Sequence, residues 1–262
     1  ADLTIATIWK ISSAGALLST FTLENAAALL INSIALNAKG FTLGGISAND
    51  FGSSGVLISG DVDGKFEKPM YLGKSDTSVE AVVRGTDSSV YAIGSSTELL
   101  AGKKLAGLRD GVIAKYSSTG KLTALVRSSA AKAKREWTSA TSALFLAGSV
   151  QSGQKFESAV TKFATNLSPT WTYRFASTGA TYVAIGASGS AYAAFTSKSA
   201  VKGVSNWKPN KPSALLLSFD SKGAISDART AAGVPIALGY SRDLGVVLMT
   251  SSQTAVSIFR LT

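Results

Sequence analysis

Two acidic residues, Asp61 and Asp63, come nearest to a metal-ligating pattern in this chain. They belong to the segment Asp61-Val62-Asp63-Gly64, whose alternate carboxylates and glycine bend match the first positions of a calcium-binding loop. The segment lacks a third acidic position, and no later glutamate stands at the spacing of a calcium loop. Asp and Gly are also favoured in hairpin turns that bind no metal. The sequence therefore leaves a weak calcium site and a plain turn as alternatives, and no other cofactor is expected.

Acid–base catalysis would require two carboxylates a few ångströms apart in a cleft. The close pairs in the sequence are Asp61 with Asp63, and Glu98 with Asp110 across one loop. The chain has no histidine and no cysteine. This composition excludes a Ser-His-Asp triad, a histidine base and a zinc site built on either residue. We therefore expect that the chain is not an enzyme, and a hydrolase or lyase ranks third among the functions considered.

The densest basic run contains Arg127, Lys132, Lys134 and Arg135. Such a run can bind the phosphate or sulfate groups of a polyanion, with an affinity that falls as salt is raised. It belongs to the basic sector of residues 99–262, which carries 20 Lys and Arg against 6 Asp and Glu. The alternatives are a polyanion-binding site, for nucleic acid or acidic polysaccharide, and a connection between two sheets whose charges are solvated.

One aromatic residue, Trp207, stands in a long loop rather than in an apolar run. Prolines flank it, and Lys202, Lys208 and Lys211 surround it. An exposed tryptophan beside cations can stack on a sugar ring or anchor a protein partner. In the alternative, the indole folds back over the edge of its own sheet. The sequence predicts a partner-binding site at these four residues if the indole is exposed.

A short turn motif recurs along the chain and identifies the elements that must position these residues. It reads Lys-Ile-Ser-Ser-Ala-Gly at 10–15, Lys-Tyr-Ser-Ser-Thr-Gly at 115–120 and Ser-Phe-Asp-Ser-Lys-Gly at 218–223. Each copy follows one apolar run and precedes another, which is typical of a hairpin turn between two strands. The sequence therefore predicts an all-β repeat protein.

The clearest repeat predicts four short strands, a to d, at 78–83, 90–94, 111–116 and 122–126. Four strands bounded by turn residues form one blade of a β-propeller. The c strands end at Ile11, Gly60, Tyr116, Phe163, Phe219 and Leu261, at intervals of 42 to 56 residues. Periods near 40 to 50 residues are typical of propeller blades. We expect one propeller domain over residues 1–262, built of four-stranded antiparallel blades.

The number of blades depends on how the ends of the chain are used. The sequence predicts five a, five b and five d strands but six c strands, because the chain opens on c and d and ends on a, b and c. If Ala16–Leu23 pairs beside Ala255–Leu261, the N-terminal segment closes a five-bladed ring and residues 3–11 are surplus. We expect this closure, since it removes free sheet edges. The alternative has six blades, two of them incomplete.

Residues 90–126 resemble the bacterial SBBP β-propeller repeat. The strand Val90-Tyr91-Ala92-Ile93-Gly94-Ser95-Ser96-Thr97 is similar to its "vYvtGsT" pattern. Gly107, then Asp110-Gly111-Val112-Ile113-Ala114-Lys115-Tyr116 and Gly120, follow its "G-x-x-DafvaKy-x-x-x-G" pattern. The other repeats match in part and have no obvious counterpart of Asp110. The resemblance implies a secreted or surface-exposed bacterial protein with a structural or interaction role, and it carries no catalytic motif.

Composition agrees with export. Hydrophobic residues make up 45% of the chain and charged residues 16%, with many small residues, which is more typical of secreted proteins than of cytoplasmic enzymes. The longest apolar stretch, 26–31, is too short to cross a membrane. The leading function is therefore a secreted or cell-surface β-propeller, a structural or interaction module for protein or glycan partners at its long b–c loops. Nucleic acid is not the partner we expect.

Overall fold

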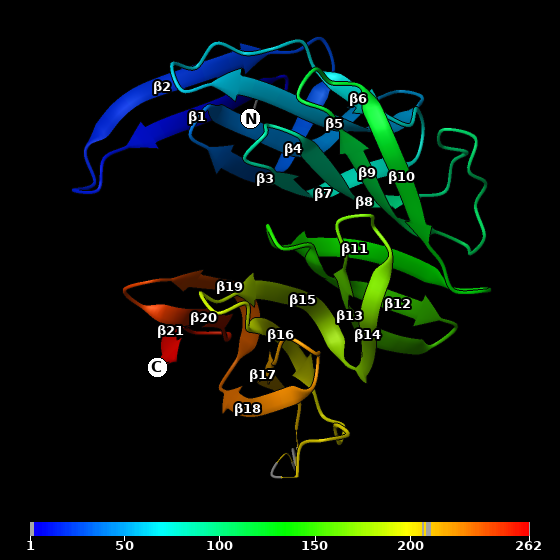
Figure 1. Ribbon diagram of the computed structural model, residues 1–262, viewed down its shortest axis with the longest axis vertical. Helices are drawn as coiled ribbons and strands as arrows, with labels where there is room; N and C mark the ends of the chain where they lie inside the picture. The colour runs from blue at the N-terminus through cyan, green and yellow to red at the C-terminus, as the bar shows by residue number, and fades with distance from the viewer. Residues whose placement is uncertain (1–2, 206, 208–210, 262) are drawn as a thin grey trace. The chain divides into compact units, whose positions relative to one another are not determined.

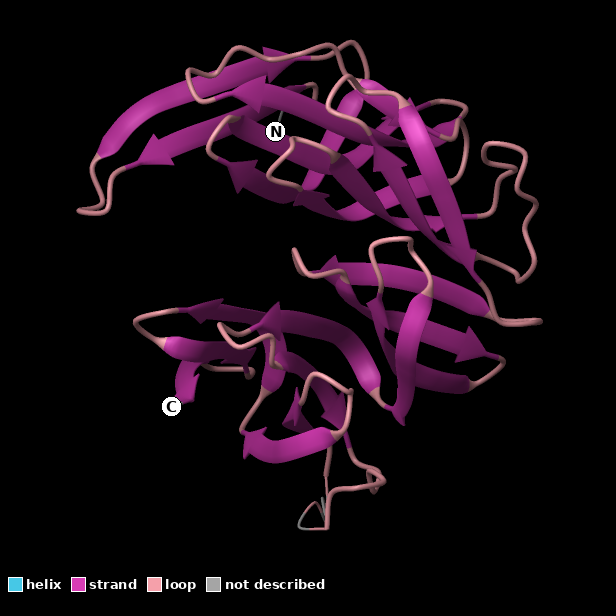
Figure 2. Cartoon of the chain, in the orientation of Figure 1, coloured by secondary structure: helices cyan, strands magenta, loops and turns pink. Residues whose placement is uncertain are grey.

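The computed structural model describes residues 3–205, 207 and 211–261 as β-strands joined by turns and loops (Figure 2). The strands number 21 and form six antiparallel sheets, in which consecutive strands are hydrogen-bonded neighbours. The described residues contain no helix, and hence none that could cross a membrane. The all-β fold predicted from the turn motif is confirmed.

The sheets follow one another in chain order (Figure 1). The first sheet has two strands, β1 (Ile5–Ile11) and β2 (Leu17–Glu24). The second has β3 (Ala28–Asn37), β4 (Gly40–Asn49), β5 (Gly52–Asp61) and β6 (Met70–Leu72). The third has β7 (Thr77–Arg84), β8 (Val90–Ser96), β9 (Asp110–Tyr116) and β10 (Leu122–Ser128).

The last three sheets continue this order. The fourth has β11 (Lys134–Ala140), β12 (Phe145–Ser152), β13 (Lys155–Phe163) and β14 (Pro169–Ala176). The fifth has β15 (Thr178–Ile185), β16 (Ala191–Ser197), β17 (Ser213–Phe219) and β18 (Ile225–Ala231). The sixth has three strands, β19 (Val234–Ser241), β20 (Gly245–Ser251) and β21 (Val256–Leu261).

The recurring turn has one backbone geometry in five sheets. Its fourth residue donates a backbone hydrogen bond to the carbonyl of the first and adopts a left-handed conformation. That conformation is open to glycine at no steric cost, which explains the recurring glycine. These fourth residues are Gly15 (φ 84°), Gly64 (φ 85°), Gly120 (φ 77°), Leu167 (φ 65°) and Gly223 (φ 87°). The predicted hairpin turn is thus confirmed, including a copy without glycine.

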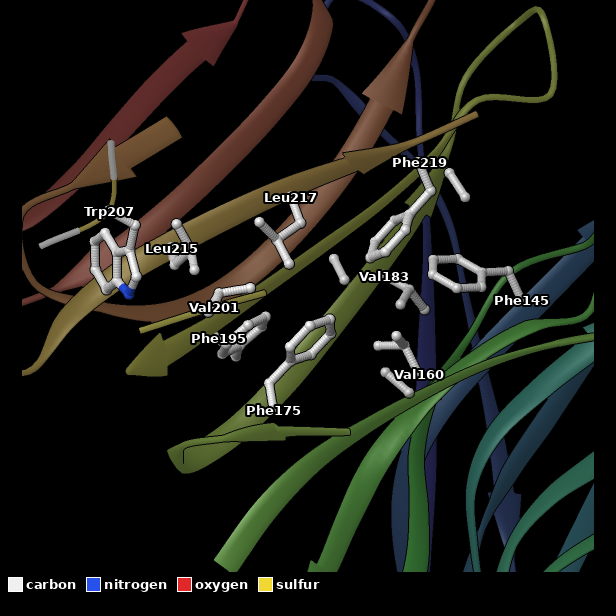
Figure 3. Packing of buried hydrophobic residues seen from close by; sticks show 13 residues of the cluster. Phe145, Val160, Phe175, Val183, Phe195, Val201, Trp207, Leu215, Leu217 and Phe219 are labelled. Carbon is white, nitrogen blue, oxygen red and sulfur yellow. The ribbon is translucent and has the colours of Figure 1, made fainter. Parts of the chain in front are cut away.

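The chain forms two compact units. Unit 1 comprises residues 1–105 and 113–125, and unit 2 comprises 106–112 and 126–262. In unit 1, side chains of the first two sheets share a core around Val56 and Ile58. In unit 2, a larger core contains Phe145, Phe195 and Phe219 (Figure 3). A single domain over residues 1–262 stays a prediction.

The predicted pairing of Ala16–Leu23 beside Ala255–Leu261 would join strands of the two units, and it stays a prediction. Among the described strands, β2 has β1 as its pairing partner, and β21 has β20. The repeated turn at 12–15 explains this, because a short hairpin brings β2 onto β1 at little entropic cost. Residues 3–11 are therefore not surplus. Six sheets, two of them with fewer than four strands, match the six-bladed alternative.

The incomplete first sheet leaves apolar residues uncovered on its neighbour. Ile34 and Leu36 of β3 pair with Leu43 and Phe41 of β4, so they share the face on which the unit 1 core lies. They are nevertheless 47% and 69% exposed. The first sheet has two strands where a complete one has four.

Candidate functional site

The long loop between β16 and β17 is held down by Trp207. The indole is 6% exposed and packs in the unit 2 core beside Val201 and Leu215 (Figure 3). Its Nε1–H donates a hydrogen bond to the carbonyl of Ser199 at 2.6 Å. Of the two alternatives that the sequence left open, the indole folds back over its own sheet, which buries the ring and satisfies its N–H group. A role of Trp207 in binding stays a prediction.

The predicted lysines of this loop fall into two separate places. Lys202 and Lys211 are exposed, and Lys208 lies outside the described residues. Lys202 lines a groove of about 600 Å³ on one side of the loop. Further residues of this groove are Tyr173, Arg174, Phe175, Val201 and Ile225. Arg174 also pairs with Glu157.

Lys211 lines a second concavity, of about 790 Å³. Its walls include the hydroxyl residues Thr196, Ser213, Ser251 and Ser252 and the amide of Gln253. The Oγ1 atom of Thr196 is buried and has no hydrogen-bond partner in the described part of the chain. Among the residues that the structure describes, no Asp or Glu lines either concavity. Their lining residues therefore add no carboxylate that would repel an acidic or polyhydroxyl group, although Glu157 pairs with Arg174 of the first groove.

The four basic residues predicted to bind polyanions do not act as one patch. Arg127 pairs with buried Asp110 at 2.8 Å, and its own side chain is 6% exposed. Arg135 lies over the ring of Trp137, with its guanidinium carbon 4.4 Å from the ring centroid. Burial, together with the charge of Arg174, lowers the pKa of Arg135 to about 10. Lys132 and Lys134 remain as the exposed members of the run.

Asp110 is the centre of a buried polar network at the start of β9. Its carboxylate is fully buried and accepts hydrogen bonds from the N–H groups of Ala106 and Gly107, at 3.0 and 2.9 Å. Burial alone would raise the pKa of Asp110, but these bonds, with those from Ser129 and Arg127, lower it below its usual value. The aspartate that the SBBP resemblance singled out thus holds a loop in place.

The carboxylate of Asp61 also accepts hydrogen bonds from backbone N–H groups. Its Oδ1 accepts hydrogen bonds from the N–H groups of Asp63 and Lys65, at 3.0 and 2.9 Å. Asp220 makes the same contacts with Lys222 and Ala224 in another copy of the turn. The segment from Asp61 is therefore the hairpin turn of its sheet. Among the described residues, no group of three or more acidic side chains could hold a metal ion.

Glu98 fastens the connection between the second and third sheets. Its carboxylate accepts hydrogen bonds from the N–H groups of Lys74, Ser75 and Asp76 and from the hydroxyl of Thr77, at 2.7 to 3.1 Å. Burial opposes the charge, but the hydrogen bonds outweigh it and lower the pKa of Glu98 to about 2, from 4.5. Glu98 and Asp110 are thus ionised structural groups in separate networks.

Protonation of Glu98 at low pH should remove the stabilisation that its hydrogen bonds give to the connection between the second and third sheets. A carboxylate with a lowered folded-state pKa stabilises the fold above its unfolded pKa of 4.5, and this stabilisation disappears as pH falls towards about 2. Since the group is partly exposed, we expect a contribution of about 2 kcal/mol at pH 6. Urea unfolding of wild type and Glu98→Gln should differ by this amount at pH 6 and by much less at pH 2.5. Glu24→Gln, on an exposed side chain, is the control and should have a small effect at both pH values.

The residues that sequence reasoning missed lie on the walls of the first groove. Tyr173 and Arg174 belong to β14, an edge strand of the fourth sheet, whereas Lys202 lies in the loop between β16 and β17 of the fifth sheet. Tyr173 stacks on Phe175 with ring centroids 5.8 Å apart. The alternation Trp171-Thr172-Tyr173-Arg174-Phe175 is a signal for an aromatic face, but it does not say which loop meets that face.

Comparison with known proteins supports the fold. The chain is similar over 97% of its length to a protein of unknown function from Bacteroides caccae, with 9% identity, 89% of that chain covered and a TM-score of 0.56. It is also similar over 96% of its length to the Dos1 propeller, with 10% identity and a TM-score of 0.50, and spans 58% of that chain. BamB from Moraxella catarrhalis is less similar, with 10% identity, a TM-score of 0.37, and coverage of 94% of this chain and 89% of that one.

No protein-family model matches the sequence, and no curated protein matches it significantly. At such low identity the structural likeness shows the fold alone. Together with the antiparallel sheets, it confirms the β-propeller fold. The resemblance to the SBBP repeat in particular stays a prediction.

Proposed function

We propose that the chain is a non-enzymatic β-propeller, exported to the cell surface or beyond it, that binds an acidic protein or glycan partner beside the loop between β16 and β17. The observation that carries the proposal is the pair of concavities beside this loop. Each contains at least one cationic residue and no carboxylate residue. The buried Trp207 supports the proposal by fixing the loop that presents Lys202 and Lys211.

The non-enzymatic part of the proposal draws support from the carboxylates. Glu98 and Asp110 each accept several hydrogen bonds and have lowered pKa values, whereas a general acid needs a raised pKa. The carboxylate of Asp61 accepts two backbone hydrogen bonds within its hairpin turn. Composition and the SBBP resemblance support export.

Neutralising the two loop lysines should weaken binding. A glycan array and a protein-partner capture, both at low and high salt, would first identify the ligand. For that ligand, the double variant Lys202→Gln/Lys211→Gln should lose affinity by about tenfold at low ionic strength and by little at high salt, because exposed charges are screened. Titration calorimetry at two salt concentrations measures the difference.

The matched control removes the same charge from another place. Lys132→Gln/Lys134→Gln should leave the affinity within about twofold at either salt concentration. A ligand whose binding depends on Lys132 and Lys134 instead would favour the second candidate function, a polyanion-binding domain using the basic sector. Trp207→Ala, which frees the loop, should weaken binding at every salt concentration. An unchanged affinity in both Trp207→Ala and the loop-lysine variant would contradict the proposal.

A further inference from the structure

Arg84, at the end of β7 in unit 1, forms no ion pair within 4 Å among the described residues. Its Nη1 donates hydrogen bonds to the carbonyl of Phe41 at 3.1 Å and the hydroxyl of Thr42 at 2.7 Å. Its Nε is buried and has no acceptor among the described residues. A buried N–H group without a partner costs about 1 to 3 kcal/mol. The guanidinium thus retains donors for a further acceptor.

The other half-buried arginines of the chain each lie beside a carboxylate or an aromatic ring. Arg109 lies 3.7 Å from a carboxylate oxygen of Glu136, and Arg127 lies 2.8 Å from one of Asp110. Arg135 stacks on the ring of Trp137, although its buried Nε also has no acceptor among the described residues. Arg84 has neither a carboxylate nor an aromatic ring as a partner in the part of the chain that the structure describes.

Arg84 lines a polar concavity of about 340 Å³ that is separate from the loop described above. The residues that line it all belong to unit 1. Lys39 adds a second cation, and Ser88, Ser117 and Ser118 add hydroxyl groups. Guanidinium, ammonium and hydroxyl donors together suit a single oxyanionic group.

Two carboxylates, Glu67 and Asp87, also line this concavity and restrict what it can accept. Both are exposed. Asp87 accepts hydrogen bonds from the hydroxyl of Ser89 at 2.7 Å and from its N–H at 3.0 Å. These bonds lower the pKa of Asp87, so its negative charge persists at neutral pH. These charges would repel a long polyanion more strongly than a small ligand with one anionic group.

We propose that the concavity around Arg84 and Lys39 is a binding site for one phosphate or carboxylate group of a small molecule. Arg84 lines the concavity and supplies a positive charge and guanidinium N–H donors to such a group. Lys39 supplies attraction, and the serine hydroxyls supply further hydrogen bonds. The site does not depend on the function proposed for the other loop.

The test is titration of the whole chain with inorganic phosphate, acetate and heparin, measured by calorimetry at low ionic strength. Phosphate and acetate should bind saturably. Arg84→Gln should weaken both by about tenfold or more, and Lys39→Gln by about threefold. Arg242→Gln, which removes the same charge from an exposed residue of unit 2, should leave both within about twofold. Heparin affinity should not change in Arg84→Gln.

A direct readout keeps the test decisive if Arg84→Gln folds poorly. In wild type, the Nε–H resonance of Arg84 in a ¹H–¹⁵N spectrum should shift on addition of phosphate or acetate, with the same saturation as the calorimetry. Absence of saturable binding in wild type, or equal affinity in Arg84→Gln and wild type, would overturn the proposal. Heparin binding that is lost in Arg84→Gln would overturn its restriction to small ligands.

Discussion

Replacement of Asp110 by alanine is expected to lower the free energy of unfolding by about 3 to 5 kcal/mol, the usual cost of breaking a buried ion pair. The substitution leaves the guanidinium of Arg127 buried without its counter-charge, and it removes the acceptor of the N–H groups of Ala106 and Gly107. Urea unfolding at pH 7, followed by circular dichroism, measures the loss.

A second ion pair of this chain provides a matched control. Arg229 and Asp227 also lie 2.8 Å apart through the same two atoms, but both side chains are 47% exposed. Asp227→Ala should therefore cost about 0 to 1 kcal/mol. The two pairs have the same chemistry and distance and differ in burial. If the two variants lost similar stability, burial would not be the source of the Asp110 effect.

Deletion of residues 1–24 is expected to destabilise unit 1 by about 4 kcal/mol or more, because it uncovers the apolar core of the second sheet. In the intact chain, Ala6 is 6% exposed in this core, and Ile8 and Leu23 pack against it. The truncated chain should unfold at lower urea concentration and aggregate through its exposed face. Circular dichroism and light scattering measure the two effects.

Point variants on the two faces of β1 test whether this strand stabilises unit 1 by covering its core. Ile8 packs on the core, whereas its neighbour Trp9 is 63% exposed. Ile8→Ala should lower the free energy of unfolding by about 2 kcal/mol, and Trp9→Ala by less than about 0.5 kcal/mol. Equal effects at the two positions, or an unchanged stability after the deletion, would mean that β1 does not cover the core.

The strands and turns of this fold could be predicted because they depend on local chemistry. The motif at 115–120 forms the expected hairpin because its glycine is left-handed and its serine hydroxyl accepts a backbone hydrogen bond. The chain also begins with a two-stranded sheet and ends with a three-stranded one, as the predicted order of strands requires. These features depend on residues a few positions apart, whose contacts the sequence displays directly.

The candidate site could be predicted in part. Lys202 and Lys211 do line concavities, because an exposed loop on a rigid sheet keeps its charges in solvent. The burial of Trp207 depends on apolar partners such as Leu215 and Phe195, which other strands supply. The environment of Arg84 could not be predicted from the sequence either, since its hydrogen-bond partners on β4 lie about forty positions earlier. Such non-local contacts leave no periodic signal.

The distribution of the four tryptophans makes their fluorescence a selective probe. Trp137, Trp171 and Trp207 belong to unit 2, where the first and last are 0% and 6% exposed. Trp9 is the tryptophan of unit 1, and it is largely in water before any unfolding begins. A shift of the emission maximum will therefore follow the opening of unit 2 and will be nearly blind to unit 1. If the units open at different urea concentrations, fluorescence and circular dichroism will give different midpoints.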